Sequence, residues 1–482
     1  MRRITTFLLA GAMCVFALPA PHTNPAKGPL KVLASNPRFF TDGSGKAVYL
    51  AGSHNWVNFK DYGESDSLNR FDYKAYLDFL QAHNHNFFRL WTWELPRSTL
   101  GRNAETWVRS PFPWKRSGPG VATDGKPKFD LSRLDDAYFD RLRDRVKIAR
   151  DRGFYVAVTL FDGYGPINNR SAEDGFPFDT GNNVNNLACG GLETQTLAIA
   201  GVTTVQENYV RKVVEKLNDL DNVLYEIANE AGPASTEWQY HMIKFIKECE
   251  AKKPKKHPVG MSYQLGGKNE ALFKSPADWI APGKDDGYQS EPPASEGTKV
   301  IINDTDHSYY WVQLKEAGLP AQQAWVWKSF TRGLNVAFMD PYLINWPGRN
   351  APQGLSPDTY WETIRVNMGY ARRFAGRVNL AAMKPIDSLS STRYCLASPT
   401  DKCAEFLVYA PQGGSVDLKL NAVKGKLYPE WFNPSVGSTE TGEPVDGGAE
   451  RSLKTPFIGD AVLYLTQKAP VVKKEPKKKA KK

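Results

Sequence analysis

The chain has 482 residues, of which 41% are hydrophobic, and it carries a formal net charge of +10. This length and composition are typical of one large globular domain plus a smaller one, and they exclude a disordered chain. The charge does not indicate nucleic-acid binding, because much of it lies in Arg2, Arg3 and the last twelve residues, which hold seven Lys and one Glu. The rest of the chain is nearly neutral. We interpret residues 469–482 as a solvated Lys-rich tail, for which contact with an anionic surface is the less common use.

The first residues follow the order of a secretory signal peptide. Arg2 and Arg3 precede a long apolar run, and small residues with Pro come after it. This pattern predicts a signal peptide at residues 1–20, cleaved after Ala17 or Ala20, and a secreted or periplasmic protein. The alternative is an uncleaved membrane anchor, but the run is shorter than the roughly 20 residues of a span. We therefore expect no integral membrane span after cleavage.

The chain has five Cys, and Cys14 would be lost with the signal peptide. Cys395 and Cys403 flank a turn at residues 399–401, so in an exported protein they are predicted to form a disulfide across a tight hairpin. For Cys189 and Cys249 the sequence leaves open a second bridge or two free thiols. No Cys/His spacing is typical of a zinc site.

Short apolar runs alternate with helical patterns over residues 30–388. A small hairpin that turns at Asp42–Gly43 leads into the first buried strand. This alternation predicts a (β/α)₈ TIM barrel, because no Gly-rich phosphate motif follows the first strand as it would in a doubly wound sheet. Strands are expected within residues 36–56, 86–94, 154–163, 222–230, 258–265, 276–283, 299–307 and 334–340, and helices at residues 71–84, 134–153, 204–221, 235–253 and 357–378.

Two regions of the chain depart from this alternation. Residues 101–130 and 163–191 are rich in Gly, Asn and Pro, and we expect them to be long loops that wall a binding cleft. Residues 391–468 show short alternating strands separated by turns. They predict a small C-terminal all-β, sandwich-like domain.

The stretch at residues 222–230, NVLYEIANE, combines a strand buried on both faces with a polar tip. Catalytic residues of barrel enzymes lie at the carboxyl ends of strands, which makes Glu230 a candidate; the alternative is a Glu that caps the next helix. The strand at residues 299–307 ends in Asp304 and Asp306, across the barrel mouth. Two opposed carboxylates are what hydrolysis of a glycosidic bond requires. No metal or organic cofactor is implied, and no G-x-S-x-G motif indicates a serine nucleophile.

Four stretches together resemble the strand ends of cellulase-like clan A glycoside hydrolases: residues 36–56, 86–94, 222–230 and 299–307. More narrowly, they resemble a branch whose C-terminal β domain is named for collagen binding. The resemblance implies that Glu230 is the acid/base, that Asn229 binds the hydroxyl beside the scissile carbon, and that Arg89 orients the nucleophile.

The resemblance also implies a Glu nucleophile at the tip of the seventh strand, where this sequence has Asp304-Thr305-Asp306-His307. We prefer Asp304 as the partner of Glu230 because it lies nearest the strand end, with Asp306 second because it shares the same face. Asp is one methylene shorter than Glu, so the carboxyl separation could exceed the roughly 5 Å of retaining enzymes. Retention and inversion both remain open.

Other polar and aromatic side chains at the strand ends are candidates for binding substrate, since aromatic rings stack on the apolar faces of sugars. Several of the charged and aromatic residues also have a purely structural interpretation. Arg89 could be a structural ion-pair partner, Asp162 and Glu94 could cap loops, and Trp325 and Trp327 could pack a helix. The substrate-binding candidates are His54, Trp56, Arg89, Trp91, Trp93, Asp162, Asn229, Tyr263 and His307.

The sequence thus predicts an exported glycoside hydrolase that acts on a plant or microbial polysaccharide or oligosaccharide. The competing hypothesis is a non-catalytic carbohydrate- or matrix-binding protein on a TIM-barrel scaffold. The Asp at the place of the expected Glu nucleophile keeps this second hypothesis open.

Overall fold

The structure is a computed structural model that describes residues 24–100, 105–342 and 357–469. The chain divides into two compact units, and the boundary along the chain lies between Lys384 and Pro385. The predicted signal peptide, Cys14 and nearly all of the Lys-rich tail lie outside the described residues. Within the described part of the chain, no helix is long and apolar enough to cross a membrane.

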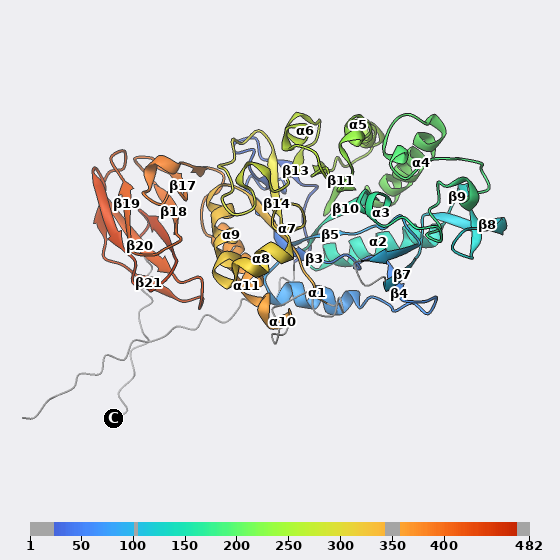
Figure 1. Cartoon of the computed structure of the whole chain (residues 1–482). Coiled ribbons are helices and arrows are strands. Elements are labelled where there is room, and N and C mark those ends of the chain that lie inside the picture. The colour runs from blue at the N-terminus through green and yellow to red at the C-terminus, as the bar shows by residue number, and fades with distance from the viewer. Residues whose placement is uncertain (1–23, 101–104, 343–356, 470–482) are drawn as a thin grey trace, which may run out of the picture. The chain divides into compact units, whose positions relative to one another are not determined.

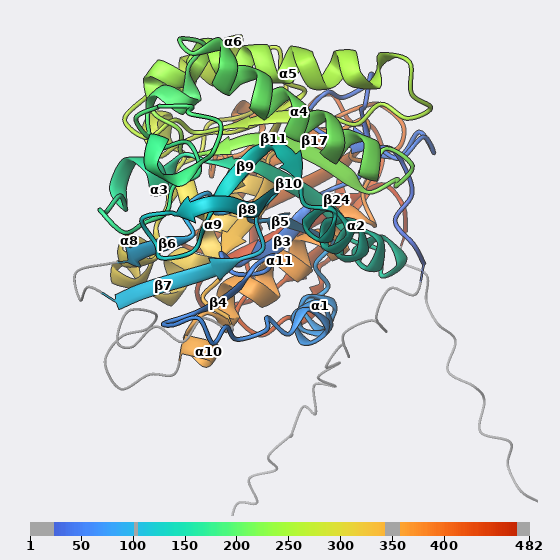
Figure 2. The same cartoon turned by 90° about the vertical axis from the view of Figure 1, so that its right-hand side faces the viewer.

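The first unit is a (β/α)₈ barrel, as the alternation of strands and helices predicts. Its eight strands form one parallel sheet in the order β3-β15-β14-β13-β12-β11-β10-β5. A parallel bridge between Asn55 and Leu90 joins the two end strands and closes the barrel. In Figure 2 the strands β3, β5, β10 and β11 lie at the centre with α2, α4 and α5 outside them. The barrel strands are β3 (Ala51–His54), β5 (Phe87–Leu90), β10 (Tyr155–Asp162), β11 (Val223–Asn229), β12 (Val259–Ser262), β13 (Trp279–Ala281), β14 (Val300–Asp304) and β15 (Asn335–Met339).

The helices begin and end where the sequence supplies the corresponding signals. Asp72 caps α1 by accepting from the backbone N–H of Ala75, and Asp135 caps α2 by accepting from that of Ala137. Trp325 and Trp327 of α9 are buried, so their packing interpretation is confirmed. The helices of this unit are α1 (Tyr73–Ala82), α2 (Asp136–Asp151), α3 (Tyr164–Asn168), α4 (Ala200–Leu217), α5 (Thr236–Ala251), α6 (Asn269–Lys274), α7 (Thr305–Ser308), α8 (Trp311–Ala317), α9 (Leu319–Thr331), α10 (Pro357–Tyr360) and α11 (Glu362–Ala375).

The barrel interior is layered. Apolar side chains that include Phe87, Leu224 and Trp279 fill the layer near the N-terminal ends of the strands. Arg89 and Glu226 begin a polar layer two residues further along their strands, and both are buried. The apolar layer therefore supports a polar cluster at the carboxyl ends of the strands, where barrel enzymes place their sites.

The expectation of a long loop at residues 101–130 is wrong, because much of this region pairs as strands. β7 (Glu105–Ser110) lies between β4 (Asp61–Gly63) and β6 (Arg97–Leu100), and β8 (Trp114–Val121) pairs with β9 (Pro127–Leu134). Gly118, Gly120 and Gly125 have positive φ and shape the β8–β9 hairpin, which projects at the right of Figure 1. Glycine and proline within these strands hide the period-two pattern by which strands are recognised.

The N-terminal hairpin is confirmed, since Phe40 and Val48 form an antiparallel bridge around the predicted turn. It is extended by a pair of short strands, β1 (Lys31–Val32) and β2 (Phe40–Thr41). Residues 163–191 contain α3 and a short 3₁₀ turn at Thr180–Asn182. A second 3₁₀ turn, at Glu193–Gln195, follows this region.

The second unit is all β, as predicted, with its own apolar core around Phe406, Val408 and Leu463. The predicted disulfide is wrong: Cys395 and Cys403 are both free thiols. Cys395 is buried opposite Val408, whereas Cys403 is exposed at the hairpin tip. The strands are β16 (Lys384–Pro385), β17 (Cys395–Ser398), β18 (Glu405–Ala410), β24 (Ala461–Thr466), β20 (Lys426–Phe432), β21 (Thr439–Thr441) and β22 (Val445–Asp446) in one sheet, with β19 (Ser415–Lys419) paired to β23 (Glu450–Lys454).

Candidate active site

A buried arginine on β5 organises the carboxyl ends of the barrel strands. Arg89 donates through Nε and Nη2 to the two carboxylate oxygens of Glu226, at 2.9 and 2.7 Å. Nη2 also donates to Asn229 Oδ1 at 2.6 Å, and Nη1 donates to Asp304 Oδ2 at 3.2 Å and Asp306 Oδ2 at 2.9 Å. All five N–H donors of the guanidinium are therefore used. Burial by itself would lower the pKa of Arg89, but the surrounding carboxylates hold it above its ordinary value.

Glu226 anchors this arginine from within the barrel, and sequence reasoning missed it. Besides Arg89, its carboxylate accepts the hydroxyl of Thr159 on β10 at 2.6 Å and that of Ser262 on β12. Glu226 is fully buried, and these four bonds use both oxygens. Its chemistry is therefore structural: it fixes Arg89 and takes no part at the barrel mouth. The available signal was a charged residue in the middle of an otherwise apolar strand.

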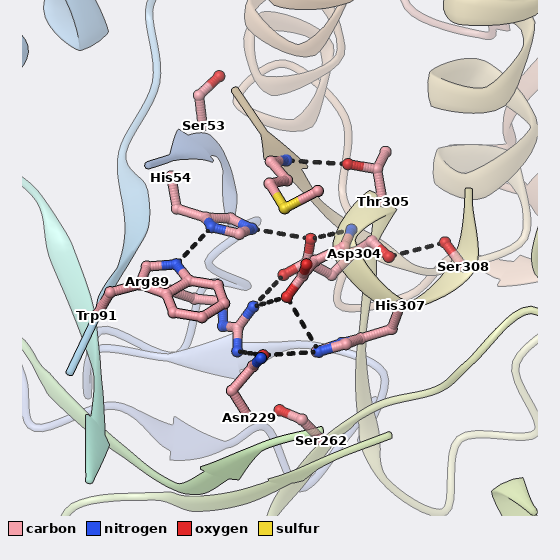
Figure 3. Close-up of polar contacts among 12 residues, drawn as sticks. Ser53, His54, Arg89, Trp91, Asn229, Ser262, Asp304, Thr305, His307 and Ser308 are labelled. Atoms are coloured by element: carbon pink, nitrogen blue, oxygen red, sulfur yellow. Dashed lines mark hydrogen bonds and ion pairs between the residues drawn. The ribbon is translucent and has the colours of Figure 1, made fainter. Parts of the chain in front are cut away.

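Asp304, at the end of β14, is held on both of its oxygens. Oδ1 lies 2.9 Å from His54 Nε2 and accepts the backbone N–H of Asp306 at 3.0 Å, while Oδ2 accepts from Arg89. Trp91 Nε1 donates to His54 Nδ1 at 2.9 Å, so Nδ1 is the acceptor and Nε2 carries the proton given to Asp304 (Figure 3). Burial opposes the charge on Asp304, but His54 and Arg89 outweigh it and hold its pKa below the usual range.

Asp306 lies in the first turn of α7 and is slightly more exposed, at 5% against 0% for Asp304. Its Oδ2 accepts from Arg89 and lies 3.3 Å from His307 Nε2. Among the described residues, Asp306 Oδ1 has no hydrogen-bond partner. One oxygen of Asp306 is thus fixed by Arg89, and the other is left for a different partner.

His307 closes the cluster from the side of Asn229. Its Nε2 lies 3.1 Å from Asn229 Oδ1, which already accepts from Arg89. Nε2 must therefore be the donor, and Nδ1 has no partner in the described part of the chain. Burial lowers the pKa of His307 against the opposing effect of Asp306 and Asp304. His307 is thus a neutral donor that fixes the amide of Asn229.

Glu230 directly follows β11 and has a left-handed backbone, with φ of 52°. Such conformations are uncommon for residues other than glycine and cluster at functional sites. Tyr310, which no sequence argument singled out, donates its hydroxyl to Glu230 Oε1 at 3.1 Å. Burial, followed by the charge of Asp306, raises the pKa of Glu230 well above its ordinary value, and Tyr310 and Arg89 oppose this only in part. Its surroundings therefore favour the protonated form of Glu230.

The two other acidic candidates lie below the surface of the site. Asp162 is fully buried and accepts the backbone N–H of Gly165 at 3.0 Å, as the capping alternative expects. Its backbone N–H donates to Glu94 Oε2 at 3.0 Å. Burial raises the pKa of Asp162 to about 6, and burial together with Asp162 raises that of Glu94 to about 8. Asp162 therefore affects Glu230 through its charge rather than by touching a ligand.

The aromatic candidates form two stacks. Trp56 stacks on Trp311 with ring centroids 4.9 Å apart, and its backbone carbonyl accepts from Trp93 Nε1 at 2.8 Å. Trp91 stacks on Trp93 at 5.8 Å and is also stacked with His54. Tyr263 is 7% exposed, with its ring 6.3 Å from that of His307. Of the predicted aromatic residues, Trp56 is the one whose ring is only partly buried.

No three His, Cys, Asp or Glu side chains gather as metal ligands in the described residues. The buried carboxylates described above instead accept hydrogen bonds from Arg89, His54, hydroxyl groups and backbone N–H groups. The arrangement can supply a proton from Glu230 and a negative charge from Asp306. Acid and base placed together in this way can cleave an acetal bond.

No protein-family profile matches the sequence, and no curated protein matches it. Solved structures do share its fold. A glycoside hydrolase aligns with a TM-score of 0.58 and 13% identity over 91% of this chain and 97% of its own. A glycoside hydrolase family 5 protein from Bacteroides vulgatus aligns with a TM-score of 0.59 and 14% identity, over 91% and 94%. A candidate glycoside hydrolase from the same organism reaches a TM-score of 0.63 at 13% identity, over 91% and 82%.

At these identities the similarity establishes the fold, a (β/α)₈ barrel of the kind that glycoside hydrolases use. Fold alone does not define activity, which depends on the residues of the site. The relation to the branch with a collagen-binding domain stays a prediction.

Proposed function

We propose that the protein is a glycoside hydrolase in which Glu230 is the general acid and Asp306 is the opposing carboxylate. The observation that carries this proposal is the raised pKa of Glu230 opposite a carboxylate that Arg89 holds. Burial, followed by the charge of Asp306, raises the pKa of Glu230, and Arg89 donates to Asp306. A carboxyl group whose pKa is raised beside a second carboxylate is suited to act as the general acid.

The contacts favour Asp306 over Asp304, which the sequence argument preferred. Asp304 has both oxygens occupied by His54, Arg89 and the helix backbone, and it is fully buried. A nucleophile or base needs an oxygen that can reach the sugar carbon or a water molecule. Asp306 Oδ1 meets this requirement within the described chain. In this proposal Asp304 holds His54 and the first turn of α7 in place.

The proposed reaction follows from these positions. Glu230 gives its proton to the glycosidic oxygen as the bond to the sugar carbon breaks, so the leaving alcohol departs neutral. Asp306 either attacks that carbon or takes a proton from the water that attacks it. In the first case Glu230, now ionised, takes a proton from the water that releases the sugar from Asp306. In this proposal Arg89 stabilises the Asp306 carboxylate, and Asn229 donates its amide N–H groups to a sugar hydroxyl.

The substrate we propose is a plant or microbial polysaccharide or an oligosaccharide made from one. The stack of Trp56 on Trp311 supports this, because the partly buried Trp56 ring belongs to the same strand-end region as the carboxylates. Export rests on residues 1–20 and is part of the proposal. Contact of the Lys-rich tail with an anionic surface is likewise proposed.

The test is sugar release from a panel of plant and bacterial polysaccharides by the mature chain, Glu230→Gln and Asp306→Asn. We expect release by the parent chain and a loss of at least about 100-fold in each variant, the size expected for removal of an acid or base. Lys268→Ala, an exposed change that keeps the cluster intact, is the matched control. Tight binding to a glycan that no variant and no parent chain cleaves would contradict the hydrolase and support the carbohydrate-binding alternative.

A further inference from the structure

A cavity of about 570 Å³ opens at the opposite end of the barrel from the carboxylates. Its walls include Tyr49, which precedes β3, Asn86, which precedes β5, and Tyr155, the first residue of β10. These positions place the cavity at the N-terminal ends of the strands. Its volume lies within the range of small-molecule sites. The proposed glycosidase chemistry makes no use of it.

The charged side chains of this cavity are mostly basic. Lys27, Arg372, Arg373 and Arg377 line it, and Asp42 is the acidic residue among its described lining. The arginines come from the last turn of α11 and the residues just after it, where cations also complement the helix dipole. The helix dipole can explain why arginines lie at the end of α11, but it does not explain why three of these arginines line the same cavity.

Arg372 holds the adjoining loop with only one part of its guanidinium. Nη1 donates to the backbone O of Asn84 at 2.9 Å and to its Oδ1 at 2.8 Å, and lies 3.5 Å from the backbone O of His85. Nε and Nη2 donate to no acceptor in the described part of the chain. Burial lowers the pKa of Arg372 to about 10, and the opposing contribution comes from Tyr155 rather than from a carboxylate.

Among the described residues, the two most deeply buried arginines of the barrel, Arg89 and Arg365, use that same edge for a carboxylate of the chain. Arg89 presents Nε and Nη2 to Glu226. Arg365 presents them to Asp340, at 2.8 and 2.6 Å. This edge matches the two oxygens of a carboxylate, sulfate or phosphate. Arg372 lines a cavity with basic walls, and no carboxylate of the described chain binds its Nε or Nη2.

We propose that this cavity binds a small molecule that carries an oxyanion, held on the Nε–Nη2 edge of Arg372 and surrounded by Lys27, Arg373 and Arg377. Carboxylate, sulfate and phosphate share the required chemistry. The ligand is either a free inorganic anion or an acidic sugar, whose body would contact Val48 and Tyr155 on the less polar walls. The site is separate from the catalytic one, so it does not depend on the proposed hydrolase activity.

Calorimetric titration of the mature chain at fixed ionic strength tests this proposal, with sodium sulfate, sodium phosphate and sodium glucuronate as probes and chloride as the background. We expect saturable binding to one site for at least one probe. Sulfate or phosphate binding without glucuronate binding would identify a free-anion site, whereas tighter binding of glucuronate would identify an acidic-sugar site.

Variants locate the binding. Arg372→Lys removes the two-pronged edge and is expected to weaken affinity at least about tenfold. Arg377→Ala and Asp42→Asn leave the contacts to Asn84 in place, and we expect affinity to fall and to rise, respectively, by about threefold. Glu230→Gln and Lys268→Ala should leave affinity unchanged. Absence of saturable binding for all three probes, equal affinity in Arg372→Lys, or loss of binding in Glu230→Gln would overturn the proposal.

Discussion

The hydrogen bond from Tyr310 to Glu230 predicts a specific change in the pH dependence of activity. The Tyr310 hydroxyl donates to Oε1, and a donor stabilises the carboxylate more than the neutral acid. This bond therefore lowers the pKa of Glu230, although burial and Asp306 keep it raised overall. Tyr310→Phe should raise that pKa further, so that Glu230 stays protonated to higher pH.

The size of this effect follows from the contact. A hydrogen bond to a charged group contributes about 1.5–3 kcal/mol. Tyr310 is only partly buried, and water can replace part of the lost bond, so we take about 1.4 kcal/mol. One pKa unit corresponds to about 1.36 kcal/mol, which places the expected rise at about one pH unit.

The assay is kcat/KM against pH on a polysaccharide that the protein cleaves, because the alkaline limb of this profile reports the pKa of the acid in the free enzyme. Tyr310→Phe should move the alkaline limb upward by about one pH unit while the acid limb moves less. Tyr309→Phe, a neighbouring change with no bond to Glu230, is the control and should leave the limb in place. An alkaline limb that stays fixed or moves downward in Tyr310→Phe would refute the assigned role of Glu230 or of this bond.

Further substitutions distinguish carboxylates that stabilise the fold from those proposed to act in catalysis. Asp306→Asn should lower kcat/KM at least about 100-fold and lower the free energy of unfolding, measured with urea, by less than Asp304→Asn does, because Asp306 is held through one oxygen and Asp304 through both. Asp304→Asn should also lower the free energy of unfolding by about 3 kcal/mol, because it breaks a buried ion pair. Glu226→Gln should cost a similar amount, since it removes the carboxylate that binds Arg89 twice. The pKa of Glu94 is raised to about 8, so its neutral form favours folding below its unfolded pKa, and this stability is lost as pH rises through 8. Glu94→Gln should therefore flatten the fall in thermal midpoint between about pH 5 and 8.

Glu237→Gln on the exposed face of α5 is the matched control for these variants, because it removes a carboxylate without touching the cluster. Equal losses of stability in Asp306→Asn and Asp304→Asn would contradict the division between them. A Glu94→Gln variant whose thermal midpoint follows that of the parent chain across this pH range would show that Glu94 is not held neutral by the fold.

The barrel could be predicted because its strands and helices carry strong local signals. The stretch at residues 222–230 shows a buried strand by its apolar run, and the structure confirms that strand as β11, with the polar tip at its carboxyl end. The hairpin β8–β9 could not be read in this way, because Gly118 and Gly120 interrupt the alternation that marks strands.

From the sequence, only those site residues that lie at the ends of predicted strands could be identified. Glu226 and Asn229 both bind Arg89 although they lie three residues apart, which the period of two in a regular strand does not predict. Tyr310 belongs to the connection between α7 and α8, and only the folded chain brings it to Glu230. The choice between Asp304 and Asp306 also depends on tertiary contacts, namely which oxygen atoms are already occupied.

The central claim is that Glu230 supplies the proton to the leaving group while Asp306 acts at the sugar carbon. Once the released sugar is known, its dinitrophenyl glycoside tests this directly, because that leaving group departs without a proton. We expect Glu230→Gln to lose hydrolysis of the polysaccharide but to retain cleavage of the dinitrophenyl glycoside, and Asp306→Asn to lose both. Equal loss on the two substrates in Glu230→Gln, or full activity in Asp306→Asn, would contradict the account.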